Sequence, residues 1–317
     1  MTLTRGSKVL FLDSIKLAKT QLAAFQKVAT VVPNTSTTRE QFISDLGTKY
    51  KDVSGIYRHF KASESIKITG RFDQELVSKL PRSLKFIAHN GAGYDQIDIP
   101  ACTTRKVQVS NVPTAVDGAT ADTAIFLILS VLRQFPLALA HAQAGTFNSA
   151  LPLSNDPKGK VLGIVGMGGI GSALALRAKA LGMEVVYHNR KRVDAGKEKD
   201  LGVRYVGSVE ELLKTSDVIS LNLPLTPSTH HLISTPQFDL LKPTALAGVG
   251  LDVYENEPKI PKELLDDPRA VCLPHVGTVT VETQEEMEAV CLKNLETGLK
   301  TGKMGFVVAE QKQLLEE

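Results

Sequence analysis

Hydrophobic and polar positions follow two different periods along the first hundred residues of the chain. Short apolar runs of strand length lie at Val9–Leu12, Val53–Tyr57 and Leu84–Ala88. Between them, Ile15–Phe25 and Gln74–Leu80 have the apolar spacing of helices. This alternation predicts a small α/β domain of its own, without the pattern of a phosphate-binding loop.

A second region begins after the turn Asn111–Pro113, where an almost entirely apolar helix is predicted over Ala119–Leu132. A helix that is apolar on every side must be buried, so we expect it at the junction between two domains. The stretch Gly145–Gly159 is rich in proline, serine and asparagine and is predicted to be a loop.

Residues 161–192 carry the most informative pattern. An apolar strand leads into the glycines Gly166, Gly168 and Gly171, an alanine- and leucine-rich helix, and a second apolar run over Met183–Tyr187. Strand, tight turn, helix and strand in this order predict the phosphate-binding half of a doubly wound dinucleotide fold. A glycine-rich turn without a ligand is the alternative interpretation.

Each glycine has a steric role in such a fold. Gly166 permits the sharp turn, Gly168 lets the backbone approach a pyrophosphate, and Gly171 lets the helix pack close to the strand. The N–H groups and the dipole at the start of the helix favour the anion. The residues expected to hold the pyrophosphate are Gly166, Gly168, Gly169, Ile170 and Gly171.

The remaining elements follow from the same criteria. A capping box predicts a helix start at Ser208 with Glu211. The other predicted elements are the strands Val218–Leu223, Ala245–Val253 and Ala270–Leu273, the end of a short helix at Asp239–Leu241, and an amphipathic closing helix over Glu282–Leu299.

Composition excludes several classes of protein. The 317 residues suit two domains, and a net charge of +3 is too small to indicate nucleic acid or an anionic membrane as partner. The most apolar stretch, Ala124–Leu132, is shorter than the ~20 residues that cross a bilayer. Cys102, Cys272 and Cys291 lack metal-ligand spacing, so we expect no metal site and a reducing compartment. Without a visible signal peptide, a cytoplasmic protein is predicted.

Two short stretches after the dinucleotide unit are candidates for chemistry, Leu251–Pro258 and Leu273–Thr278. Both begin at the carboxyl end of an apolar strand, where open α/β sheets bind their ligands. A carboxylate beside a histidine stabilises the imidazolium form, which suits acid–base catalysis and points to Glu257 and His275. Spacing alone leaves open that His275 is a structural histidine.

Five motifs in order along nearly the whole chain resemble the D-isomer-specific 2-hydroxyacid dehydrogenases, in particular the glyoxylate/hydroxypyruvate reductase and D-mandelate dehydrogenase branches. The motifs are HNGAGYDQID from His89, the GMGGIG loop, LNLPLTPSTHHLI from Leu221, GLDVYENEP and LPHVGTVT. The resemblance implies a homodimer of two Rossmann-like domains with parallel, doubly wound sheets. The substrate domain would comprise residues 1–111 and 286–317, and the dinucleotide-binding domain residues 112–285.

The resemblance also implies residue roles. His275 would protonate the carbonyl of a small 2-oxo acid while the nicotinamide delivers hydride, with Glu257 as its carboxylate partner. The backbone N–H groups of Gly91, Ala92 and Gly93 would hold the substrate carboxylate, although an ordinary turn is the alternative there. The remaining cofactor contacts would come from Leu223, Pro224, Asp252 and Gly277.

The end of the second strand of the dinucleotide unit bears on the choice of cofactor. NAD-specific folds usually carry Asp or Glu there, to bind the ribose 2′-hydroxyl. This chain has Asn189 followed by Arg190, Lys191 and Arg192. Without a carboxylate to repel a 2′-phosphate and with cations nearby, NADP(H) is the preferred cofactor and NAD(H) the alternative.

One departure from the family pattern stands out. The family has a substrate-binding arginine in an N-x-x-R-G run after the fifth strand, and this sequence lacks it. Leu246 instead joins Ala247 directly, as if one β–α unit of about two dozen residues were absent. Either the next strand then pairs beside Val218–Leu223 and displaces His275 and Glu257 by ~4.8 Å, or a gap opens in the sheet.

Arg58 lies where the first domain could face substrate, with a solvated surface arginine as the alternative. Two functional hypotheses remain. The first is an NADP(H)-dependent, D-stereospecific reductase of a small 2-oxo acid such as glyoxylate, hydroxypyruvate or phenylglyoxylate. The second is a dinucleotide-binding protein with little or no turnover, because the arginine segment is missing.

Overall fold

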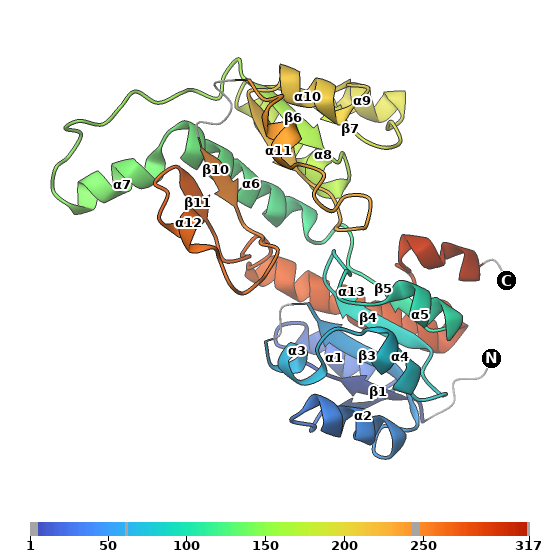
Figure 1. Ribbon diagram of the computed structural model, residues 1–317. Coiled ribbons are helices and arrows are strands. Elements are labelled where there is room, and N and C mark those ends of the chain that lie inside the picture. The colour runs from blue at the N-terminus through green and yellow to red at the C-terminus, as the bar shows by residue number, and fades with distance from the viewer. Residues whose placement is uncertain (1–5, 61–62, 243–247, 316–317) are drawn as a thin grey trace. The chain divides into compact units, whose positions relative to one another are not determined.

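The computed structural model of the protein describes residues 6–60, 63–242 and 248–315. The chain forms two compact units (Figure 1), of which unit 1 comprises Met1–Ala115 and Thr280–Glu317, and unit 2 comprises Val116–Val279. The sequence places the corresponding boundaries after residue 111 and before residue 286. The junction Leu246–Ala247 lies outside the described residues.

Unit 1 is an α/β sandwich around a five-stranded parallel sheet of order β2-β1-β3-β4-β5. Its elements are β1 (Lys8–Phe11), α1 (Lys19–Phe25), β2 (Thr30–Pro33), α2 (Arg39–Gly47), β3 (Val53–His59), α3 (Ser63–Thr69), α4 (Gln74–Lys79), β4 (Phe86–Asn90), α5 (Ile99–Thr104), β5 (Gln108–Ser110), α13 (Val281–Thr301) and the 3₁₀ helix η1 (Ala309–Leu315). Apolar side chains such as Leu10, Ile56 and Ile87 form the core against the helices.

The closing helix α13 packs against β4 and α1 within this unit. Its buried Glu288 accepts hydrogen bonds from the N–H groups of Lys16, Leu17 and Ala18, at 2.8–2.9 Å. The carboxylate thus satisfies N–H groups that immediately precede a helix and have no partner within it. The helix predicted from Ile15 begins at Lys19.

Unit 2 contains a four-stranded parallel sheet of order β8-β7-β6-β9 and a separate pair, β10-β11. Its elements are α6 (Asp117–Leu132), α7 (Phe135–Gln143), β6 (Val161–Val165), α8 (Gly169–Ala180), β7 (Glu184–His188), α9 (Ala195–Leu201), β8 (Arg204–Tyr205), α10 (Val209–Thr215), β9 (Val218–Leu221), α11 (Thr235–Phe238), β10 (Val249–Leu251), α12 (Lys262–Leu265) and β11 (Ala270–Cys272). The four-stranded order is that of the first strands of a doubly wound nucleotide fold. The predicted α/β class with parallel sheets is confirmed.

The break between the two sheets decides between the alternatives that the sequence leaves open. Among the described residues, β10 pairs with β11 and not with β9, so a gap separates the four-stranded sheet from the β10–β11 pair. Figure 1 shows the β10–β11 pair lying against α6, apart from β6 and β7. None of the residues in β9, β10 and β11 is fully buried, and Leu221 at the end of β9 is 54% exposed. The strands beside the gap therefore contribute only partly buried side chains, such as Val218 and Ile219, to the apolar core.

Helix α6 connects the two sheets. Its Ala121 and Ile128 pack with Leu162 of β6, and a Cβ placed on Gly250 of β10 would lie 2.8 Å from Leu127 Cβ. The prediction that this helix is buried on every side is wrong, because Phe126 is 51% exposed. Within the described residues no single helix is long and apolar enough to span a membrane. Helices α6 and α7 reach that length and apolar composition only when taken together, and a 70° bend separates them.

Candidate active site

The glycine-rich turn joins β6 to the start of α8, as the sequence predicts. Gly166 has φ +103°, which side chains other than glycine rarely adopt, and a Cβ there would also collide with the Asn222 carbonyl. A Cβ on Gly171 would collide with the carbonyl oxygen of Gly166, so helix and turn are in close contact. Around Gly168 no atom lies within 4 Å of a Cβ position, which leaves space for a ligand.

The start of α8 has the donors that a pyrophosphate requires. The N–H groups of residues 168–171 donate to no residue in the described part of the chain. By contrast, Met167 N–H donates to Asn189 Oδ1 at 2.6 Å and Gly166 N–H to the His188 carbonyl at 3.0 Å. Open N–H groups at the positive end of a helix dipole form an anion site, so these residues fit the predicted dinucleotide.

The three cations of the basic turn after β7, Arg190, Lys191 and Arg192, differ in whether they have an acidic partner. Arg192 is paired with Glu198 at 2.7 Å, lies over the Tyr205 ring and lowers the pKa of Glu198 to about 2. Arg190 and Lys191 are exposed and form no ion pair with any residue that the structure describes. They are therefore the cations that remain available to a 2′-phosphate.

His275 and Glu257 come together on the β10–β11 pair. Glu257 follows β10, His275 follows β11, and His275 Nδ1 lies 2.8 Å from Glu257 Oε2. The second carboxylate oxygen, Oε1, accepts the N–H of Tyr254 at 2.9 Å. Because both residues belong to one strand pair, the interrupted sheet leaves their mutual geometry intact.

Tyr254 and Asp252 hold the two loops of this pair together. The Tyr254 hydroxyl lies 3.0 Å from the carbonyl oxygen of Leu273 and 3.3 Å from that of Leu251, so its single proton can be donated to either, and burial raises its pKa. Asp252 accepts the N–H groups of Val276 and Gly277 at 2.7 and 2.8 Å. Asp252 thus orients the turn that carries His275, and its predicted contact with a nicotinamide stays a prediction.

Tyr254 is a site residue that the sequence does not single out, although it lies between Asp252 and Glu257. Asp117 is another, because its carboxylate lies against Gly169 at the start of α8 and burial raises its pKa. Leu223 and Pro224 are exposed after β9, and a Leu223 methyl lies 2.9 Å from a Cβ position on Gly166, beside the glycine turn. Gly277 is buried.

The predicted substrate turn lies in unit 1. The N–H groups of Ala92 and Gly93 donate to no described residue, whereas Gly91 N–H donates to the His89 carbonyl at 3.0 Å. The amide of Gly91 is therefore already used within the protein. A Cβ on Gly91 would lie 2.8 Å from Phe60 Cβ and 2.9 Å from His89 Nε2, so this position requires glycine.

The position of Arg58 contradicts one of its two alternatives, that of a solvated surface arginine. It is 1% exposed, so it is no surface arginine, and its guanidinium contacts His89 and Gln96 instead of solvent. Parallel pairing of β3 with β4 sets Arg58 opposite His89. A direct contact with substrate is therefore not supported by its position.

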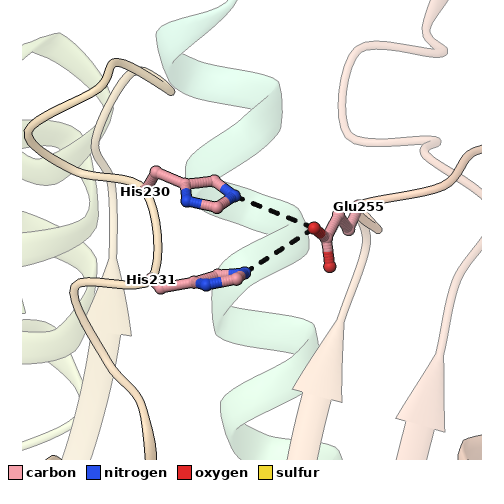
Figure 2. Close-up of side chains that lie close together, drawn as sticks. All are labelled: His230, His231 and Glu255. Carbon is pink, nitrogen blue, oxygen red and sulfur yellow. Dashed lines mark ion pairs between the residues drawn. The ribbon is translucent and has the colours of Figure 1, made fainter.

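A cluster of His230, His231 and Glu255 bridges the loops that follow β9 and β10 (Figure 2). Figure 2 shows the two imidazoles reaching toward one carboxylate oxygen, at 3.8 and 3.6 Å. The rings are stacked, with 3.7 Å between centroids and 27° between planes. Lone pairs that run side by side in stacked rings do not converge about 2 Å from each nitrogen, as a zinc ion would require. We assign this cluster no metal.

Comparison with known proteins identifies relatives along the whole chain. The model of the D-isomer specific 2-hydroxyacid dehydrogenase NAD binding domain matches residues 125–247. The chain is 43% identical to 4-methyl-2-oxopentanoate reductase A of Aspergillus oryzae over 330 residues, covering 96% of this chain and 98% of that protein.

Solved structures give the same result. A glyoxylate reductase from Paecilomyes thermophila has a TM-score of 0.91 and 41% identity, covering 98% of this chain and 100% of its own. The holo form of D-mandelate dehydrogenase from Rhodotorula graminis has a TM-score of 0.90 and 32% identity, covering 96% and 97%. A glyoxylate/hydroxypyruvate reductase from Sinorhizobium meliloti, solved with NADP and malonate, has 27% identity and a TM-score of 0.79, covering 96% and 97%.

Proposed function

Because the chain belongs to the D-isomer-specific 2-hydroxyacid dehydrogenase family, we propose that it transfers a hydride between NADP(H) or NAD(H) and a small 2-oxo or 2-hydroxy acid. Glyoxylate, hydroxypyruvate and phenylglyoxylate are the candidate substrates, with D stereochemistry in the product. The 2.8 Å contact between His275 Nδ1 and Glu257 Oε2 is the observation that carries this proposal. The relatives support this hypothesis rather than a dinucleotide-binding protein with little turnover.

In the proposed reaction the bound cofactor supplies the hydride to the substrate's carbonyl carbon. His275 Nε2 donates the proton to the carbonyl oxygen, which completes the hydroxyl group, and takes it back in the reverse direction. Glu257 Oε2 accepts a hydrogen bond from His275 Nδ1–H and stabilises the imidazolium form of His275. The open N–H groups of Ala92 and Gly93 bind the substrate carboxylate.

The decisive experiment combines turnover with binding. NADPH consumption by the full chain is measured with glyoxylate, hydroxypyruvate and phenylglyoxylate, and NADPH binding is measured directly by its fluorescence. We expect turnover with at least one of the three acids. NADPH binding without any turnover would favour the dinucleotide-binding hypothesis, and absence of binding would contradict both.

NADP(H) is the proposed cofactor in preference to NAD(H), on the strength of Asn189 and the exposed Arg190 and Lys191. Replacing Arg190 with serine is expected to weaken NADPH binding by about tenfold, because a charge-assisted contact with the 2′-phosphate is lost. NADH binding should change less than about twofold, since it lacks that phosphate.

Arg192→Ser provides the matched control for this prediction. Its guanidinium is already paired with Glu198, so we expect a smaller effect on the Kd for NADPH than that of Arg190→Ser. Tighter binding of NADH than of NADPH by the unaltered chain, or equal effects of both substitutions, would contradict the proposed preference.

The chain is proposed to lack the family's strand, substrate-binding arginine and following helix at Leu246–Ala247. Three observations support this: the N-x-x-R-G run is absent from the sequence, the sheet is interrupted between β9 and β10, and the family match ends at residue 247. In addition, the similarity to the Aspergillus oryzae reductase runs over 330 residues, more than the 317 of this chain.

A homodimer is the proposed assembly, and α7 supports it. None of the residues of α7 is buried although most are apolar, and Leu139 is 59% exposed. The segment that follows extends away from the rest of unit 2 and exposes Phe147 and Leu153 (Figure 1). Sedimentation of the full chain as a monomer would contradict this assembly. A cytoplasmic location stays a prediction, supported by the three free cysteine thiols.

A further inference from the structure

Arg58 and His89 form a buried polar pair beneath the turn Gly91–Tyr94. Their strands are parallel and in register at these two positions, which places both side chains on one face of the sheet. Arg58 is 1% exposed and His89 is fully buried. Arg58 Nη1 lies 3.3 Å from His89 Nδ1, and Nη2 donates to Gln96 Oε1 at 2.7 Å.

Donor and acceptor chemistry assigns the proton on His89. A guanidinium group can only donate, so His89 Nδ1 must be the acceptor and the ring proton must be on Nε2. His89 Nε2 lies 2.8 Å from the carbonyl oxygen of Gly93 and therefore donates to it. Burial, and next the charge of Arg58, hold the pKa of His89 well below its ordinary value, so the ring is neutral at pH 7.

Arg58 is a cation that the fold retains in the interior. Burial lowers its pKa to about 10, which still leaves it protonated at neutral pH. Its guanidinium carbon lies 5.1 Å from the centre of the Phe72 ring, a favourable cation–π position. A buried charge is costly, so a function that depends on its fixed donors would explain its presence.

The bond from His89 is one of three that tie the turn's carbonyls to the protein. Gly91 O accepts Val112 N–H at 2.9 Å, Ala92 O accepts Asn111 Nδ2 at 2.8 Å, and Gly93 O accepts His89 Nε2 at 2.8 Å. In a trans peptide the N–H points away from the carbonyl. The three following N–H groups, of Ala92, Gly93 and Tyr94, therefore point away from these partners and donate to no described residue.

We propose that Arg58 and His89 are positioning residues for the substrate carboxylate: Arg58 fixes the Nε2–H tautomer of His89, which holds the Gly93 carbonyl and so aims the N–H groups of the turn at the anion. This inference rests on the proposed function, in which the turn binds the carboxylate. It differs from a direct role of Arg58, because the guanidinium lies in the interior and acts only through the imidazole.

Two substitutions of similar size separate positioning from packing. In His89→Gln the amide nitrogen can donate to Gly93 O while the amide oxygen accepts from Arg58, so we expect a KM for glyoxylate within about twofold of the unaltered chain. In His89→Leu both bonds are lost, and we expect KM to rise by about tenfold with kcat within about threefold. Arg58→Met is expected to behave like His89→Leu.

Glu288→Gln is the control for general destabilisation. It removes the charge of a buried carboxylate that binds the start of α1, so it should lower the melting temperature without raising KM. The Kd for NADPH should stay the same in all four variants. A KM rise in His89→Gln equal to that in His89→Leu, or a fall in kcat alone, would overturn the inference.

A second readout does not depend on turnover. In ¹⁵N-labelled full chain, the His89 ring signals are assigned by their absence in His89→Gln. We expect one neutral tautomer with the proton on Nε2 between pH 5 and 8, and a mixed or shifted tautomer in Arg58→Met. A proton on Nδ1, or titration of His89 in this range, would overturn the inference even if the chain proves inactive. Inactivity together with the expected tautomer would instead count against the proposed function.

Discussion

Insertion of the family's strand, N-x-x-R-G run and following helix between Leu246 and Ala247 is expected to raise kcat/KM for a 2-oxo acid by about 10²- to 10³-fold. The inserted arginine would bind the substrate carboxylate with two parallel hydrogen bonds and polarise its carbonyl, which a lysine does less well. The inserted strand would also pair with β9 and β10 at the edges that no other described strand covers, and bury side chains such as Leu221. Steady-state kinetics of the chimera against the natural chain measures the gain.

A second chimera separates the arginine from the strand. With methionine in place of the inserted arginine, the sheet is completed but the carboxylate ligand is missing. We expect this chimera to gain thermal stability and little activity. Equal activity of the two chimeras would show that the guanidinium is not what the chain lacks, and the estimate of its contribution would be wrong.

Replacing His275 with glutamine is expected to lower kcat by about 10²- to 10⁴-fold, the usual contribution of a general acid or base. Glutamine can hydrogen-bond to a carbonyl oxygen but cannot exchange a proton with it. Replacing Glu257 with glutamine should lower kcat by roughly tenfold to 10²-fold, since a charged hydrogen bond to Nδ1 becomes a neutral one. Neither change should alter the Kd for NADPH.

A second histidine–glutamate pair in the same unit supplies the control. His230 lies 3.8 Å from Glu255, and both side chains are exposed. His230→Gln is therefore expected to leave kcat within about twofold of the natural value. If His275→Gln were no more damaging than His230→Gln, the proposed role of His275 in proton transfer would be refuted.

Local patterns predict the strand, glycine-rich turn and helix of residues 161–180 well, and the binding of a nucleotide there stays a prediction. The strand that ends at Val165, the three glycines and α8 lie within a short continuous segment, so their geometry depends on neighbours in sequence. The helix start predicted at Ser208 is also confirmed, since the Ser208 side chain accepts the N–H of Glu211 at 3.1 Å. This contact, too, joins residues that are close in sequence. The reciprocal bond, however, goes from Gly207 N–H to Glu211 and not from the Ser208 backbone.

Elements that are short or bury few residues escape this approach. Strand β2, Thr30–Pro33, has no fully buried residue, and α2, Arg39–Gly47, buries only Phe42 and Leu46. Strand β2 is too short to show a period, and α2 is mostly polar, so neither stands out in the sequence. Both become recognisable only where β1 pairs with β2 and where α2 lies against the core.

The amino-acid sequence alone determined the α/β class and the glycine-rich turn between β6 and α8, and it singled out His275 and Glu257 as candidates, since each depends on local steric rules or on a motif whose residues are contiguous. The tertiary structure decided what depends on distant partners. Parallel pairing of β3 with β4 buries Arg58 beside His89. Both carboxylate oxygens of Asp252 accept N–H groups of the turn after β11. Strand β10 pairs with β11 instead of β9. Strand pairing and burial are set by packing between segments far apart in the chain, and composition or period within one segment carries no information about that choice.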